Sequence, residues 1–394
     1  MSRWAGTGQG ALAPGPVPSA VKAALGDDRL ARAAWSRLAE PGDTAATRLV
    51  AEVGAPLALE AVVTGRGPER WRTRLADLDP ASDVAAVRAA GGRVLVPGDD
   101  EWPTGLGDLD VDAGGDGPLG APFCLWVRGP VHVADVCARS AALVGSRAAT
   151  GYGRHVAAEL AAGVADRGFA VVSGGAFGID AAAHRAALAV EGVSVAVLAC
   201  GVDRSYPAGN AALLAELART GALVSEVPPG TTPTRWRFLE RNRLIAALTR
   251  GTVVVEAAWR SGALSTADRA ERLLRPVGAV PGPVTSAASA GCHRLLRERG
   301  AVCVTSAEEV VELVGELDGR ALPVPVVQTR PFDGLDRDEL RVAECLPRRG
   351  ACGLDRLARD AGLAAGTVQA VLGRLELSGH AVRHDGGWRR GTVA

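Results

Sequence analysis

Short, continuous apolar runs alternate with longer segments of helical periodicity through the middle of the chain. The helical segments span residues 153–167, 180–190, 210–219 and 264–274. The β-rich apolar runs span residues 141–144, 169–172, 194–198, 222–224, 252–255, 277–280 and 301–304. Strands that are buried on both faces read as continuous apolar runs, and helices join these ones. The order therefore predicts an α/β fold with a parallel sheet covered on both sides.

Other patterns flank this core. Two further short strands, 93–97 and 123–127, extend it, so we expect an extended Rossmann-like domain at residues 91–317. Helical spacing predicts a small helical domain of the SAM or helix-hairpin-helix kind at residues 19–90, for which a packing role without a ligand is the simpler interpretation. Helical segments 337–346, 354–361 and 364–378, followed by two short strands, predict a winged-helix-like domain at residues 333–394. Residues 318–332 read as a Pro-rich linker, and residues 1–18 as a disordered leader without a secretory signal.

Composition narrows the possible partners. The 394-residue chain is 47% hydrophobic but has no apolar run of the roughly 20 residues that span a bilayer, so no membrane role is expected. Its net charge is zero, and Lys22 is the only lysine. Any anion site must therefore use backbone amides or arginine, whose planar fork suits phosphate. Seven cysteines without a Cys-x-x-Cys pair favour reduced thiols in a cytoplasmic protein and predict no metal site.

Two turns of small residues follow neighbouring strands. Gly145-Ser146-Arg147 follows the first, and Ser173-Gly174-Gly175-Ala176-Phe177-Gly178 follows the second. A helical pattern begins soon after each turn, so amides and the helix dipole can face the same anion. Because the carboxyl ends of parallel strands meet at one edge, the turns predict one phosphate-binding groove. Neither turn has the dinucleotide or Walker pattern, which disfavours NAD and ATP, and no cofactor is expected.

A segment rich in arginine and aromatic residues lies at a predicted loop-to-helix junction. Residues 234–243 read Thr-Arg-Trp-Arg-Phe-Leu-Glu-Arg-Asn-Arg. Basic side chains interleaved with rings are typical of single-stranded nucleic-acid binding, where bases stack on the rings. A solvated arginine face is the alternative interpretation of this segment.

These motifs together resemble a known family. The two turns are followed in order by His184, Tyr206-Pro207, Ser225-Glu226, Arg241-Asn242-Arg243, Val255-Glu256-Ala257, Ser261-Gly262 and Pro281-Gly282. This series resembles the DprA/Smf DNA-processing proteins. The resemblance implies an extended Rossmann-like domain that binds single-stranded DNA, forms a homodimer and hands the strand to a RecA-type recombinase, as in natural transformation of competent bacteria.

The resemblance also assigns roles. It makes Arg147 the principal phosphate contact, Arg235 a basic DNA contact and Phe177 a base-stacking ring, although a core position for Phe177 is the alternative. Asp180 and His184 share a helix face and are expected to pair, and Glu256 is expected to orient neighbouring arginines or backbone. The full set of expected DNA- and phosphate-binding residues is Gly145, Ser146, Arg147, Ser173, Gly174, Gly175, Phe177, Gly178, Arg235, Arg237, Arg241, Asn242, Arg243, Ser261 and Gly262.

Three positions depart from the family pattern. Leu239 stands where relatives often have proline, and Ala208 and Ala211 stand where some have lysine. Fewer positive charges predict weaker DNA binding with a shallower salt dependence.

Other functions remain open. A nucleotide-monophosphate phosphoribohydrolase would share the Rossmann-like core, but residues 255–263 lack the acid after paired glycines that such enzymes need, so we expect no enzyme. A nucleotide-sensing protein would use the same pocket. In the tail, the presumed recognition helix at 367–378 has only Arg374 as a cation, which favours an accessory or protein-contact role over groove reading.

Overall fold

The computed structural model describes residues 19–111, 117–315, 332, 335–384 and 386–391. The chain divides into two compact units, Met1–Asp318 and Gly319–Ala394. The predicted leader, and the predicted linker apart from Phe332, lie outside the described residues.

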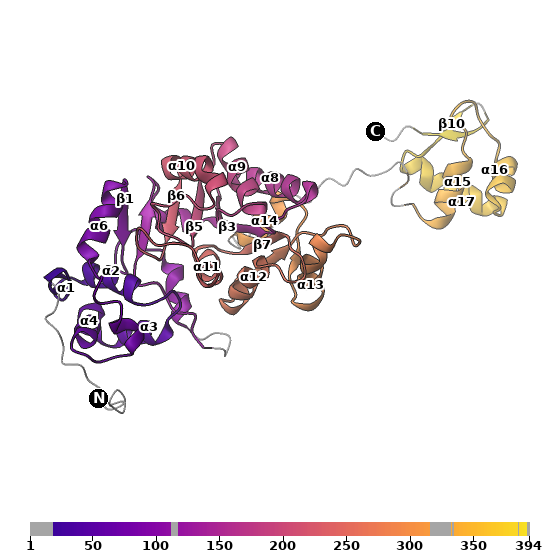
Figure 1. Ribbon diagram of the computed structural model, residues 1–394. Coiled ribbons are helices and arrows are strands. Elements are labelled where there is room, and N and C mark those ends of the chain that lie inside the picture. The colour runs from indigo at the N-terminus through magenta and orange to yellow at the C-terminus, as the bar shows by residue number, and fades with distance from the viewer. Residues whose placement is uncertain (1–18, 112–116, 316–331, 333–334, 385, 392–394) are drawn as a thin grey trace. The chain divides into compact units, whose positions relative to one another are not determined.

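A nine-stranded sheet forms the centre of the first unit, in the order β1-β2-β6-β5-β4-β3-β7-β8-β9 (Figure 1). The pairs from β6 to β9 are parallel, and β1 and β2 pair antiparallel at one edge. The predicted parallel sheet is therefore confirmed, with an antiparallel extension. The strands are β1 (Gly92–Leu95), β2 (Leu125–Arg128), β3 (Ser140–Gly145), β4 (Ala170–Ser173), β5 (Ser194–Leu198), β6 (Ala222–Ser225), β7 (Thr252–Glu256), β8 (Val277–Ala279) and β9 (Val302–Cys303).

The strand order reverses between β3 and β7. From β3 the chain adds β4, β5 and β6 on one side, and then returns to add β7, β8 and β9 on the other. In open α/β sheets, ligands bind beyond the carboxyl ends of the strands at such a reversal. Both glycine turns follow strands beside this point.

Helices cover both faces of the sheet (Figure 1). The apolar clusters place α8, α9, α10 and α14 on one face and α7, α11, α12 and α13 on the other. Their bounds are α7 (Val133–Ala138), α8 (Gly151–Asp166), α9 (Ile179–Ala189), α10 (Ala211–Thr220), α11 (Arg235–Leu248), α12 (Ala263–Arg272), α13 (Ala290–Glu298) and α14 (Ala307–Val314).

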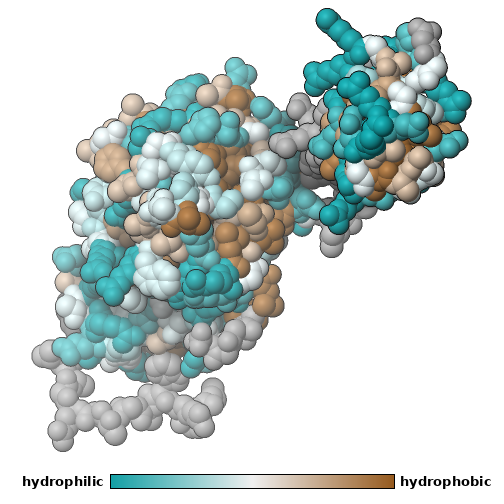
Figure 2. All heavy atoms as spheres, turned by 90° about the vertical axis from the view of Figure 1, so that its right-hand side faces the viewer, coloured by the Kyte–Doolittle hydropathy of each residue, from teal (hydrophilic) through white to brown (hydrophobic). Residues whose placement is uncertain are grey.

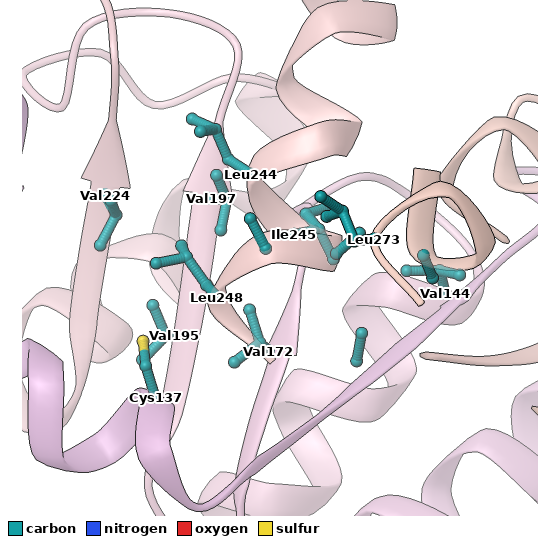
Figure 3. Packing of buried hydrophobic residues seen from close by; sticks show 14 of the residues in the cluster. Cys137, Val144, Val172, Val195, Val197, Val224, Leu244, Ile245, Leu248 and Leu273 are labelled. Carbon is teal, nitrogen blue, oxygen red and sulfur yellow. The ribbon is translucent and has the colours of Figure 1, made fainter. Parts of the chain in front are cut away.

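Helix α11 is anchored to the sheet through its second half. Leu244, Ile245 and Leu248 lie in one core cluster with Val172 and Val197 of the central strands (Figure 3). Burial of each such side chain stabilises the fold by roughly 1.5–3 kcal/mol. Because α11 connects β6 to the parallel strand β7, it begins at the carboxyl edge of the sheet. Its arginine-rich first turn is therefore held at the edge that carries the glycine turns.

The N-terminal helices pack around aromatic side chains. Trp35 and Trp71 meet edge to face, with their ring centroids 5.1 Å apart, and Phe123 lies 5.7 Å from Trp35. These helices belong to the same compact unit as the sheet, and a separate folding domain at residues 19–90 stays a prediction. The helices are α1 (Ser19–Ala24), α2 (Asp28–Leu38), α3 (Thr44–Val53), α4 (Ala55–Val63), α5 (Glu69–Arg72) and α6 (Pro80–Ala89).

The second unit has the predicted winged-helix pattern. It consists of α15 (Arg337–Cys345), α16 (Leu354–Ala361), α17 (Ala365–Leu377) and the antiparallel pair β10 (Ala381–His384) and β11 (Gly387–Arg390). A capping box between Asp336 and Glu339 starts α15, and Gly362 ends α16 in the left-handed conformation, with φ of 64°.

The surface carries no large continuous apolar face in the view of Figure 2, where hydrophobic residues form patches among hydrophilic ones. Within the described ranges, no helix is both long and apolar enough to cross a bilayer.

Candidate nucleic-acid interface

The turn after β3 is clamped between β7 and α9. A Cβ atom on Gly145 would lie 2.5 Å from Cγ1 of Ile179 and 2.8 Å from the carbonyl oxygen of Glu256, so only glycine fits. The Ser146 amide donates a 2.7 Å hydrogen bond to that Glu256 carbonyl, and the Ile179 amide donates to the Ser146 carbonyl at 3.2 Å. These contacts fix the backbone immediately before Arg147, whose side chain is exposed.

The second turn lies directly against the first. Ser173 Oγ donates to the Leu143 carbonyl of β3 at 2.6 Å. Gly178 has φ of 79°, and a Cβ atom there would collide with the carbonyl oxygens of Ser146 and Arg147. The structure thus brings the two predicted turns into one site at the switch point.

The carboxylate of Asp180 fixes the backbone of the second turn. It accepts hydrogen bonds from the amides of Gly174 at 3.2 Å and Ala176 at 3.4 Å. Burial raises the pKa of this carboxyl, against the opposing effect of the Arg241 guanidinium. The prediction that the amides of this turn bind an external anion is therefore wrong for Gly174 and Ala176, because both amides already donate to the carboxylate of Asp180.

His184 does not pair with Asp180, contrary to the sequence prediction. Its Nδ1 lies 2.7 Å from Ser194 Oγ, and that hydroxyl donates to the Val171 carbonyl. Nδ1 must therefore carry the proton and donate, while the buried Nε2 has no partner among the described residues. Burial and the positive charge of Arg241 lower the pKa of His184 to about 3, so the ring is neutral.

Arg147 stacks on an aromatic ring from α11. Its guanidinium carbon lies 4.3 Å from the centroid of Phe238, and the centroid of the Tyr206 ring lies 5.7 Å from that of Phe238. Arg147 has no hydrogen bond or ion pair to any other residue that the structure describes. Its charge is therefore held in place without being neutralised.

Two exposed rings, Phe177 and Tyr206, lie in the same region as the half-buried Phe238. Phe177 is 48% exposed, which removes the core alternative for this side chain, and Tyr206 is 44% exposed. Phe177 lies over Gly209, where an added Cβ would approach its ring to 3.0 Å. Rings of this kind, beside a free guanidinium, can stack bases while the guanidinium binds phosphate.

The four arginines of α11 have different environments. Arg235 is exposed and has no ion pair within the described chain. Arg237 instead binds Glu40 of the N-terminal region, with its Nε and one terminal nitrogen 3.0 Å from the two carboxylate oxygens. Although burial alone would raise the pKa of Glu40, hydrogen bonds from Arg237 and Arg74 hold it below its usual value. Arg237 therefore links α11 to the helices before β1.

Arg243 and Arg241 face the interior, so the prediction that they contact DNA is wrong. Arg243 is fully buried, with two nitrogens 2.5 and 2.9 Å from the carboxylate oxygens of Glu226. Arg241 is 5% exposed and donates to the carbonyls of Gly174, at 2.7 Å, and Val197. Burial lowers the pKa of Arg241 to about 10. Both side chains are structural, because a buried guanidinium needs its hydrogen bonds to offset desolvation.

The loop after β7 lies beside the same helix. Asn242, which is also buried, donates to Ser265 Oγ at 2.7 Å and to the Gly262 carbonyl at 3.3 Å. Ser261 is half-buried and Gly262 is exposed. Asn242 therefore positions the loop rather than offering its amide to DNA.

Glu256 orients backbone, one of the two roles expected for it. Its carboxylate accepts from the amide of Thr150 at 2.8 Å and from the Thr150 hydroxyl at 2.6 Å. Thr150 caps α8, so Glu256 fixes the start of the helix that follows the Arg147 turn.

Phe238 and Tyr206 are absent from the set of residues expected to bind DNA. Both lay within motifs that were noted, the arginine-rich segment and the Tyr-Pro pair, but only the fold brings them together. In the tail, the lone cation of the recognition helix is neutralised, since Arg374 lies 2.6 Å from Glu339. No group of His, Cys, Asp or Glu within the described ranges could hold a metal ion.

Comparison with known proteins agrees with this arrangement. Residues 93–315 match the family model of DNA recombination-mediator protein A, and residues 327–387 match the DprA winged helix domain. A Mycobacterium tuberculosis protein that carries the name DprA is 48% identical over 373 residues, which cover 90% of this chain and 93% of that one. The Escherichia coli protein Smf is 37% identical over 303 residues, covering 75% of this chain and 77% of its own.

A solved structure gives the same result. The X-ray structure of DNA processing protein A from Streptococcus pneumoniae superposes with a TM-score of 0.60 at 31% identity, covering 73% of this chain and 98% of that one. The matched family model is that of a recombination mediator, and the winged-helix prediction for the tail is confirmed. The chain is a member of the DprA/Smf family of DNA-processing proteins.

Proposed function

We propose that this protein binds single-stranded DNA without sequence specificity, at the carboxyl edge of its sheet. One observation carries the proposal. The guanidinium of Arg147 has no ion pair among the described residues and lies over the ring of Phe238, at the point where the strand order reverses. Phosphate oxygens would bind Arg147 and Arg235, and bases would stack on Phe177 and Tyr206.

The chemistry of the site favours a single strand over a duplex. Half-exposed rings gain from stacking only when a base is free to leave its own stack, and each stacked base contributes about 1–3 kcal/mol. The contacts that the site offers are guanidinium groups for phosphate and rings for stacking, and neither depends on the identity of the base, which supports binding that is independent of sequence.

Delivery of the strand to a RecA-type recombinase, and assembly as a homodimer, belong to the same proposal. The family to which the chain belongs is described as a recombination mediator, and a mediator must hold DNA in a form that a recombinase can take over. A role in natural transformation is the corresponding cellular setting.

The test is a binding series with fluorescein-labelled oligo-dT, mixed-sequence single strands and the matching duplex, each at two salt concentrations. We expect similar affinities for the two single strands, much weaker duplex binding, and weakening with salt because phosphate contacts release counterions. Equal affinity for duplex would contradict the proposal.

The same series separates the rival functions. Displacement of oligo-dT by micromolar mononucleotide would identify a nucleotide sensor instead. Release of free base from a nucleotide monophosphate would identify a phosphoribohydrolase.

A further inference from the structure

We propose that Trp259, with Arg260 and Arg294, forms a second stacking site, which extends the path of single-stranded DNA from the Arg147–Phe238 pair across the end of β7. This inference rests on the proposed function. It adds DNA contacts that lie outside the glycine turns and α11. It also predicts that affinity depends on the length of the DNA strand.

The loop that carries Trp259 is held at both ends. On one side, the Gly291 amide of α13 donates to the Ala257 carbonyl at 2.7 Å, and a Cβ atom on Gly291 would lie 2.8 Å from the Ala258 carbonyl. On the other side, Asn242 of α11 donates to the Gly262 carbonyl. Trp259 therefore projects from a fixed loop, which reduces the conformational entropy that a stacked base must order.

The Trp259 side chain has the properties of a stacking platform. It is 51% exposed, although an indole ring usually contributes a large buried surface. The guanidinium carbon of Arg294 lies 5.2 Å from its ring centroid. Arg294 lies over Trp259 as Arg147 lies over Phe238, but Arg294, unlike Arg147, also pairs with Glu298 at 3.3 Å.

Arg260, the next residue along the chain from Trp259, supplies a further charge. It is exposed, and it has no hydrogen bond or ion pair to another residue of the described chain. Most arginines of α11 and α12 are engaged instead, as Arg269 is with Glu240 at 3.5 Å. A free guanidinium next to an exposed indole is the combination that binds a phosphate and its base.

The two pairs lie on neighbouring elements. β3 and β7 are adjacent strands, and the turns after them meet where Ser146 donates to Glu256. Phe238 and Asn242 are one turn apart on α11, about 6 Å along its axis. The Trp259 loop is therefore tied to the Arg147 turn through β7 and to α11 through Asn242.

A protein partner is the competing occupant, since exposed tryptophan is also common at protein interfaces. Arg260, which has no ion pair among the described residues, favours a polyanion, because charged residues are depleted at the centres of protein interfaces. Arg294 already pairs with Glu298 at 3.3 Å and serves mainly to hold the ring. The experiment therefore measures the mass of the unliganded protein, which reports on self-association, as well as its affinity for oligo-dT.

The test measures affinity for oligo-dT of increasing length in the full chain, for wild type, Trp259→Ala and Trp259→Phe. We expect Trp259→Ala to bind the shortest oligonucleotides as wild type does. On longer ones it should lose roughly five- to 150-fold, the equivalent of one stacked base. In Trp259→Phe, affinity should still increase with oligonucleotide length nearly as much as in wild type. The matched control is Trp388→Ala, which removes the tryptophan of the Arg383–Trp388 pair in the second unit.

Four results would overturn the proposal. The first two are an affinity of Trp259→Ala that increases with oligonucleotide length as wild type does, and an affinity that falls equally at all lengths. The third is an equal loss of affinity in the Trp388→Ala control. The fourth is a mass of unliganded Trp259→Ala, measured by light scattering, that differs from the mass of wild type. Failure of the wild type to bind any oligonucleotide would instead remove the proposed function itself.

Discussion

The guanidinium of Arg147 lies over the ring of Phe238, with its carbon 4.3 Å from the ring centroid, and the two residues come from segments about ninety positions apart in the chain. Arg241 lies on the ring as well, with its guanidinium carbon 5.8 Å from the centroid. Phe238 therefore lies near two cations, Arg147, which has no ion pair among the described residues, and Arg241, which is buried. This arrangement orients Arg147 before any ligand arrives, so less side-chain entropy is lost when a phosphate binds.

Replacing Arg147 should weaken binding of oligo-dT selectively. We expect Arg147→Ala to lose about 10- to 150-fold in affinity, because a charge-assisted hydrogen bond contributes roughly 1.5–3 kcal/mol. The slope of log affinity against log salt should fall by about 0.7, the value for one phosphate on a single strand. Fluorescence anisotropy over a salt series measures both. Arg219→Ala is the matched control, since Arg219 lies at the end of α10 just before β6 and thus at the opposite edge.

Phe238 should act through Arg147. In a double-mutant cycle, Phe238→Ala and Arg147→Ala should be non-additive by about 0.5–1 kcal/mol, the size of an exposed cation–π contact. Affinity for oligo-dT is measured for wild type, both single variants and the double variant. Strict additivity would mean that the ring binds DNA independently of the guanidinium.

The fold could be predicted from the sequence because its strands are continuous apolar runs. The sequence prediction was wrong, however, about which arginines of α11 are buried. Leu244, Ile245 and Leu248 mark the buried face of α11, and helical spacing extends that face back to Arg241. No such signal existed for Arg243, because the second half of α11 is buried all round and its periodicity is lost. Its partner Glu226 follows β6, and strand order cannot be deduced from sequence.

The buried pair of Arg243 and Glu226 predicts a stability defect where the sequence predicted a binding defect. Arg243→Gln should lower the free energy of unfolding by about 3–5 kcal/mol, because it leaves the carboxylate of Glu226 buried and unpaired. Arg235→Gln on the same helix is the matched control, expected to keep stability and to lose DNA affinity. Urea unfolding and anisotropy on both variants distinguish the two roles. Full stability in Arg243→Gln would disprove the structural role.

The second unit should be dispensable for DNA binding. Arg374, the one cation of its presumed recognition helix, is within 3.3 Å of Asp336 and 2.6 Å of Glu339, which leaves α17 without a free charge for phosphate. A chain that ends before Pro331 should bind oligo-dT within about twofold of the full chain, well inside a tenfold change of 1.4 kcal/mol. A loss of tenfold or more in the anisotropy titration would make the tail a DNA-binding domain.

Stability should fall on mild acidification because of one buried imidazole. The pKa of His184 is about 3 in the folded chain and near 6.5 in the unfolded chain. Below pH 6.5 the imidazole therefore binds a proton in the unfolded state but stays neutral in the native state. Stability from this group is complete above pH 6.5 and is lost progressively down to pH 3. Between pH 7 and pH 5 the loss should be about 2 kcal/mol.

Urea unfolding, followed by tryptophan fluorescence at pH 7 and pH 5, measures this loss. All tryptophans except Trp388 precede residue 318, so the signal reports mainly on the unit that contains His184. His184→Asn keeps a donor toward Ser194 but has no group that titrates in this range. We therefore expect it to be less stable at pH 7 and to change less between the two pH values. Because carboxylates contribute equally to both proteins, the difference between them isolates the imidazole. An equal loss in wild type and variant would mean that His184 is protonated in the native state or is not buried.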